Sequence, residues 1–214
     1  MVDRFRGDVD TILRKVRGEM NNGGYAKMLA LKERLLELNS QNLVKINHSV
    51  MELVAAKHLI QNGFDVELEH SLDRVSCDIY AVKGYGSVIV EVETGFVPPE
   101  HAVDPLNYLN ARNASKMIRY SGFANKFILA TPPYYIMEIP PALTKPPRFR
   151  TPEEISAIKG LCDLYYTSPP VSIEEIRNAR LHSIFAVDVD NVSVREWEVN
   201  EYLGKVGFWN TQPF

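Results

Sequence analysis

The stretch from Cys77 to Thr94 places the tightest constraint on how this chain folds. Two apolar runs, rich in valine and isoleucine, meet at Gly84-Tyr85-Gly86 and predict a β-hairpin. Three carboxylates, Asp78, Glu91 and Glu93, stand within these runs. Strand interiors are poor in Asp and Glu, and a buried carboxylate is costly unless it is paired or bound to a metal. The stretch therefore predicts either a carboxylate site or an exposed polar face of the hairpin.

The register of this hairpin decides between the two interpretations. Glu91 and Glu93 are two residues apart, so they share a face. Asp78 joins them if paired residue numbers add to an odd value, for example Asp78 with Glu93, as a two-residue turn at Tyr85-Gly86 produces. An even sum turns Asp78 to the other face, because a slip of one residue inverts every side chain. The site hypothesis requires the odd register.

Three carboxylates on one face repel one another. At an effective dielectric constant of about 20, the cost is on the order of 4 kcal/mol per pair at a few ångströms. A bound divalent cation relieves this repulsion, and hard oxygen ligands suit Mg²⁺ or Mn²⁺. Such a site can orient a phosphodiester and lower the pKa of a bound water.

Periodic patterns on either side of the hairpin predict the remaining elements. We expect helices over residues 3–20, 25–38, 47–61 and 105–121, strands over 64–69, 126–130, 184–189 and 192–199, and helices opened by capping boxes at Thr151 and Ser172. The order predicts an α/β fold, a three-layer sandwich with a central mixed β-sheet. We assign residues 1–40 to an N-terminal helical hairpin, 41–135 to the α/β core, and 136–214 to a C-terminal extension packed on the core.

Composition excludes several classes of protein. The 214 residues are 45% hydrophobic and 24% charged, which is typical of a globular chain. A formal net charge of -3 argues against a general nucleic-acid coat protein but not against a local basic face. The two cysteines form no CxxC pair, so neither a zinc knuckle nor a disulfide framework is indicated. A reducing, cytoplasmic setting is therefore expected. Neither a signal peptide nor a membrane span is expected.

The pattern from about residue 47 to 132 resembles the PD-(D/E)xK nuclease superfamily, which includes restriction endonucleases and archaeal Holliday-junction resolvases. The resemblance rests on a helix glutamate, an aspartate, and a Glu-x-Glu strand followed by a helix and a strand. It implies a restriction endonuclease-like core. It also implies that Glu52 is the helix glutamate, that Asp78 and Glu91 are the metal ligands, and that Glu93 stands where the family usually has lysine.

Glu93 is the departure that matters most. It could act as a general base or a further ligand. Alternatively, the following helix supplies the lysine, and Lys116 is the natural candidate. Arg112, Lys116 and Arg119 are spaced by four and three residues, so they share a helical stripe that could contact the phosphates of a nucleic acid.

Simpler interpretations stand beside these. Ser49-Val-Met-Glu52 is itself a capping-box pattern, so Glu52 could cap its own helix. The basic stripe could be a solvated helix face. His48 and His101 are interpreted as cap and loop residues rather than as ligands.

The resemblance implies a Mg²⁺- or Mn²⁺-dependent DNA endonuclease. Its catalytic residues would be Glu52, Asp78, Glu91, Glu93 and Lys116, with Arg112, Lys116 and Arg119 facing DNA. A homodimer is expected, since two sites are needed to cut both strands with one geometry. The alternative is a catalytically inactive protein of the same fold that binds nucleic acid or a protein partner. Glu93 in place of lysine and the slightly acidic composition favour that alternative.

Overall fold

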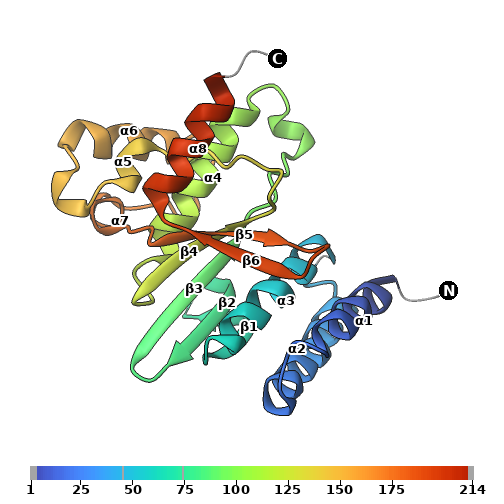
Figure 1. Cartoon of the computed structure of the whole chain (residues 1–214). Helices are drawn as coiled ribbons and strands as arrows, with labels where there is room; N and C mark the ends of the chain where they lie inside the picture. Colours follow the sequence, from blue (N-terminus) through green and yellow to red (C-terminus); the bar gives the residue numbers. More distant parts are fainter. Residues whose placement is uncertain (1–3, 45, 74, 212–214) are drawn as a thin grey trace.

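A six-stranded mixed β-sheet runs through the middle of the protein in the computed structural model, which describes residues 4–44, 46–73 and 75–211 (Figure 1). The strands are β1 (Asp65–Leu72), β2 (Val75–Lys83), β3 (Gly86–Val92), β4 (Lys126–Thr131), β5 (Ser183–Asp188) and β6 (Ser193–Trp197). They lie side by side in sequence order. The pairs β3–β4 and β4–β5 are parallel and the others are antiparallel. The predicted α/β fold with a mixed sheet is confirmed.

Helices lie on both faces of this sheet (Figure 1). The α-helices of the described residues are α1 (Arg4–Val16), α2 (Asn22–Ser40), α3 (Ile46–Gln61), α4 (Pro105–Tyr120), α5 (Pro141–Thr144), α6 (Pro152–Asp163), α7 (Ile173–Asn178) and α8 (Val199–Thr211). Short 3₁₀ helices, η1 (Pro99–His101) and η2 (Pro147–Phe149), lie in the connections. The apolar side chains of α1, α2 and α3 form one core with the sheet, and those of α4, α6 and α7 form the other. This arrangement is compatible with a three-layer sandwich.

Strand β3 shows why the centre of the sheet is apolar on both sides. Val88, Val90 and Val92 join the core under α3, whereas Ile89 joins the core under α4. A strand with parallel neighbours is covered by helices on both faces, so its sequence lacks the polar alternation of a half-exposed strand. Glu91 has the same parity as Ile89 and therefore lies on the α4 side.

The hairpin has the odd register that the carboxylate site requires. Ile79 pairs with Val90 and Lys83 pairs with Gly86, so the paired residue numbers add to 169. The turn therefore lies at Gly84-Tyr85 and not at Tyr85-Gly86, and Gly84 takes a φ of 59°, in the region that favours glycine. Continued by one residue, the register sets Asp78 opposite Glu91 instead of Glu93.

Helix α3 agrees with the helix predicted over residues 47–61 but not with the cap suggested at Ser49. The helix starts at Ile46, so Ser49 lies inside its first turns and is not the N-cap. The capping-box interpretation of Glu52 is therefore wrong. By contrast, the capping boxes at Thr151 and Ser172 are confirmed, with Glu154 and Glu175 as their respective partners.

The C-terminal part is more closely joined to the sheet than an extension would be. Strands β5 and β6, which the sequence interpretation placed in residues 136–214 outside the core, complete the central sheet. The last strand ends at Trp197, and helix α8 follows where no helix was expected.

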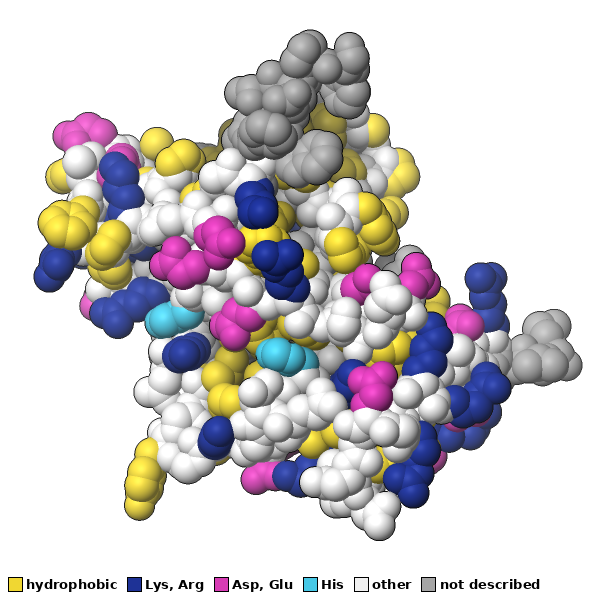
Figure 2. All heavy atoms as spheres, in the orientation of Figure 1, with side chains coloured by type: hydrophobic (Ala, Val, Ile, Leu, Met, Phe, Trp, Pro, Cys, Tyr) yellow, Lys and Arg dark blue, Asp and Glu magenta, His cyan; other side chains and the backbone are white. Residues whose placement is uncertain are grey.

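The N-terminal hairpin of α1 and α2 packs against α3 and shares its core. Buried Lys57 of α3 binds the Glu19 carboxylate after α1 and the carbonyl of Val192, between β5 and β6. Lysine and arginine side chains gather over this hairpin, with acidic side chains among them (Figure 2). Within the described residues, no helix combines the length and the apolar character needed to cross a bilayer.

Candidate functional site

The candidate site lies where strands β2 and β3 separate. Their backbone pairing ends at Ile79 and Val90. Beyond that point, the amide of Asp78 donates to Oε1 of Glu91 at 3.0 Å, and the amide of Val92 donates to Oδ2 of Asp78 at 2.6 Å. Each carboxylate is thus held by a backbone amide of the opposite strand. Charge-assisted bonds of this kind fix the position of a carboxylate more firmly than neutral ones.

Lys116 of α4 extends its ammonium into this group of carboxylates. Its Nζ lies 2.8 Å from Oε1 of Glu93, 3.0 Å from Oε2 of Glu91 and 3.6 Å from Oδ2 of Asp78. It also donates to the carbonyl of Val92 at 3.0 Å. The structure therefore places a lysine of the following helix among the three hairpin carboxylates, as the sequence interpretation offered.

Arg112 and Arg119 differ in where they point. Nε of Arg112 lies 3.0 Å from Oε1 of Glu93, and its Nη1 donates to the carbonyl of Phe96. Arg119 instead donates to Oγ of Ser115 and to the carbonyl of Pro169. All three side chains start from the same side of α4, but Arg119 lies three residues beyond Lys116, about 4.5 Å further along the helix axis and away from Arg112. Only two members of the predicted stripe reach the carboxylates.

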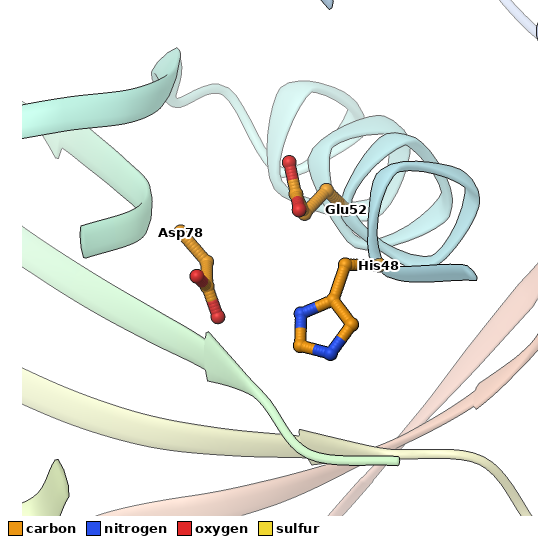
Figure 3. A group of neighbouring side chains, drawn as sticks. All are labelled: His48, Glu52 and Asp78. Carbon is orange, nitrogen blue, oxygen red and sulfur yellow. The ribbon is translucent and has the colours of Figure 1, made fainter. Parts of the chain in front are cut away.

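A second group of ligand atoms comes from α3. One ligand atom each of His48, Glu52 and Asp78 lies within 4.8 Å of the others (Figure 3). His48 and Glu52 are one helical turn apart, so they face the same way. Glu52 is fully buried, and neither of its oxygens has a hydrogen-bond partner among the described residues. A buried carboxylate in this state must either hold a proton or neutralise a cation.

Burial dominates the protonation equilibria of the site. It raises the pKa of Glu52 well above its ordinary value, and the nearby charge of Asp78 adds to the shift. Burial also raises the pKa of Glu91 to about 8, with Asp78 adding to it and Lys116 opposing it. Burial alone would lower the pKa of Lys116, but Asp78, Glu91 and Glu93 together raise it. The ammonium therefore stays charged.

Burial lowers the pKa of His48, and Lys116 and Arg112 lower it further against the opposing effect of Asp78. The neutral imidazole that results is the form that binds a metal. The donor set of one imidazole and two carboxylates fits a divalent cation. Glu91, predicted as the second ligand beside Asp78, has both oxygens engaged by Asp78 and Lys116. The structure thus offers His48 and Glu52 as partners of Asp78.

Sequence reasoning missed two residues of the site. His48 was interpreted as a cap, although its spacing of four residues from Glu52 indicated a shared helix face. Glu69 of β1 lies across from Asp78 in the β1–β2 register and takes a φ of 49°. Burial raises its pKa to about 7, and Asp78 contributes. No sequence signal marked Glu69, because it continued an ordinary alternating strand.

Comparison with known proteins gives no match to this chain, whether with protein-family models, with curated proteins or with solved structures.

Proposed function

We propose that this protein is a metal-dependent DNA endonuclease that hydrolyses phosphodiester bonds. The observation that carries the proposal is the unpartnered, buried carboxylate of Glu52 beside His48 and Asp78. Such a carboxyl group either holds a proton or neutralises a cation, and the donors around it suit a cation. The restriction endonuclease-like character of the core, which the sequence resemblance implies, belongs to the same proposal.

His48, Glu52 and Asp78 would hold the cation. A divalent ion bound there lowers the pKa of a bound water and stabilises the departing oxygen. Lys116, next to Asp78, would stabilise the negative charge that develops on a phosphate oxygen, and would donate to that oxygen if it released one of its three present acceptors. Glu93 acts through others in this proposal, because it pairs with both Lys116 and Arg112 and so fixes their positions. An imidazole in the donor set favours Mn²⁺ over Mg²⁺.

The test is cleavage of plasmid, linear and four-way-junction DNA in Mn²⁺ and in Mg²⁺. Wild type should cut at least one of these substrates, and Asp78→Asn and Glu52→Gln should each lower the rate by about 100-fold or more, as expected when a metal ligand is lost. Glu37→Gln is the matched control, since Glu37 is an exposed carboxylate of α2 paired with Arg34. Equal rates for Glu37→Gln and Asp78→Asn would refute the proposal.

One observation favours the inactive alternative. Lys116 and Arg112 already neutralise Glu91 and Glu93 without a metal. A binding module would use the same fold with this ion-pair network as a structural element. Calorimetry separates the two functions, because a binding module takes up no divalent cation at the site while DNA affinity persists.

A homodimer in an intracellular setting completes the proposal, since a duplex offers two strands of opposite polarity to two related sites. Sedimentation of the protein with and without DNA tests this assembly. A protein that cuts duplex DNA but sediments with it as a monomer would contradict the homodimer.

A further inference from the structure

A pocket of about 350 Å³ lies beside the site, between the ends of β4, β5 and β6 and helix α8. Its lining combines apolar and aromatic side chains with polar ones. Tyr135, Ile136, Trp197 and Tyr202 supply the former, and Asp188, Arg195 and Lys205 supply charge. The volume lies within the range of small-ligand sites, at its lower end. The lining therefore suits a flat, partly apolar group of the size of one nucleobase.

Two cations stand at the rim of this pocket. The guanidinium of Arg195 lies 3.6 Å from the ring centroid of Trp197, and Nζ of Lys205 lies 4.8 Å from it. Neither has a carboxylate within salt-bridge distance in the part of the chain that the structure describes. Over β6 and α8, basic side chains lie next to hydrophobic ones on the surface (Figure 2). The indole thus holds two cations whose charge is available to an anion.

Tyr135 connects the pocket lining to the chain segment that follows Glu93. A Cβ added to Gly95 would lie 2.7 Å from the Tyr135 ring, so this ring packs directly on the backbone two residues after Glu93. A second hollow, of about 780 Å³, shares Pro132, Pro133 and Asp188 with the pocket and reaches Thr94.

This second hollow carries exposed aromatic rings. Phe96 is 60% exposed and Tyr134 is 86% exposed, and both line it. Arg112 holds the Phe96 backbone beside Glu93. A groove with aromatic walls therefore leads from Thr94, the residue after Glu93, to the cations of the pocket.

We propose that this groove binds single-stranded nucleic acid, with one unpaired base in the pocket and its flanking phosphates on Arg195 and Lys205. The proposal rests on the proposed function, because the groove begins at the site where the phosphodiester would be cut. Cations interleaved with aromatic rings are the usual chemistry of single-strand binding. Asp188 also lines the pocket, where both of its oxygens accept hydrogen bonds from Asn191, and its negative charge directs a phosphate toward Arg195 and Lys205 instead.

The test is equilibrium binding of a labelled 12-nucleotide single strand to the full chain in EDTA, where no cleavage occurs. Arg195→Gln with Lys205→Gln should weaken binding by about tenfold or more at moderate salt, because two phosphate contacts are lost. The slope of log K against log salt is negative, and loss of two phosphate contacts should reduce its magnitude by about 1.4. Arg148→Gln is the matched control, since Arg148 stacks on Phe149 away from the groove.

Ile136→Trp tests the base separately from the phosphates. It fills the pocket, so it should weaken binding of the single strand with little change in the salt slope. A duplex of the same length should respond less to these variants, and free dTMP should compete poorly. Equal effects of Arg148→Gln and of the Arg195/Lys205 variant would overturn the proposal, as would equal binding of strand and mononucleotide.

This experiment separates failure of the groove from failure of the nuclease proposal. If wild type cuts DNA but the Arg195/Lys205 variant binds the strand normally, only the groove assignment fails. If wild type cuts nothing and the variant loses binding, only the nuclease proposal fails.

Discussion

The ammonium of Lys116 lies 2.8 Å from a carboxylate oxygen of Glu93, which joins helix α4 to the residue just after β3. The Glu93 side chain is fully buried, and that of Lys116 is 18% exposed. Removal of the cation would leave the hairpin carboxylates close together with only Arg112 beside them.

Lys116→Met should therefore lower the free energy of unfolding by about 3–5 kcal/mol, the usual cost of breaking a buried ion pair. It should also abolish DNA cleavage. Lys159→Met is the control, because Lys159 forms an ordinary i,i+4 pair with Asp163 on α6 and should change stability by under about 1 kcal/mol. Urea denaturation measures the unfolding free energy of both variants. Equal losses would show that the ion pairs of Lys116 stabilise the fold no more than those of Lys159.

A charge exchange tests the same pair from the other side. Glu93→Lys places a third cation beside Lys116 and Arg112, so it should destabilise the fold by several kcal/mol, on the order of a broken buried pair. Lys116→Glu added to this variant restores one pair of opposite charges and should recover part of the loss, because a carboxylate at position 116 also faces Asp78 and Glu91. A double variant no more stable than the worse single one would contradict the pairing.

Stability should depend on pH through the raised carboxyl pKa values. The pKa of Glu91 rises from an ordinary 4.5 to about 8, and that of Glu69 to about 7. At pH values between the ordinary pKa and the raised pKa, the folded state holds a proton that the unfolded state has released. The metal-free protein therefore loses stability as pH rises from about 4.5 to 8. Below pH 4.5 these carboxyl groups hold protons in both states, so this loss of stability disappears.

Comparison with Glu69→Gln/Glu91→Gln isolates this contribution from other titrating groups. The difference in unfolding free energy between this variant and wild type should grow in favour of the variant from pH 5.5 to pH 8, in buffers with EDTA. A difference that stays constant with pH would rule out the raised pKa values.

Gly95 should not tolerate a side chain. It takes a φ of 75°, and an added Cβ would meet the Tyr135 ring at 2.7 Å. Gly95→Ala should cost about 1–3 kcal/mol in unfolding free energy and displace the Thr94–Phe96 segment. Gly160→Ala, inside α6 with open space at its Cβ, should instead gain up to about 1 kcal/mol. Thermal unfolding of the two variants should shift in opposite directions.

The hairpin was predictable from the sequence because a glycine-containing turn separates two apolar runs, but its register was not, and the turn lies one residue earlier than Tyr85-Gly86. Lys116 was predictable only as a candidate, since its approach to Glu93 depends on how α4 packs on the sheet. His48 and Glu69 were missed for the same reason: local patterns do not report which helix end meets which strand. The Ser49–Glu52 capping pattern misled because α3 continues one turn further toward the N-terminus.

The C-terminal elements show a second limit. The alternation from Val192 to Val199 predicted a strand, and it is one as far as Trp197. That this strand and β5 complete the central sheet depends on non-local packing, because 51 residues separate β4 from β5. The helix α8 has a weakly amphipathic sequence, so its pattern did not stand out.

Calorimetric titration of the metal-free protein with Mn²⁺ tests the central claim most directly. Wild type should bind Mn²⁺ at the site, while His48→Ala and Glu52→Gln should weaken binding by about 10- to 100-fold or more. Glu37→Gln should bind as wild type does. Mn²⁺ uptake that is absent from wild type, or unchanged in both His48→Ala and Glu52→Gln, would contradict the assignment of a metal site to His48, Glu52 and Asp78.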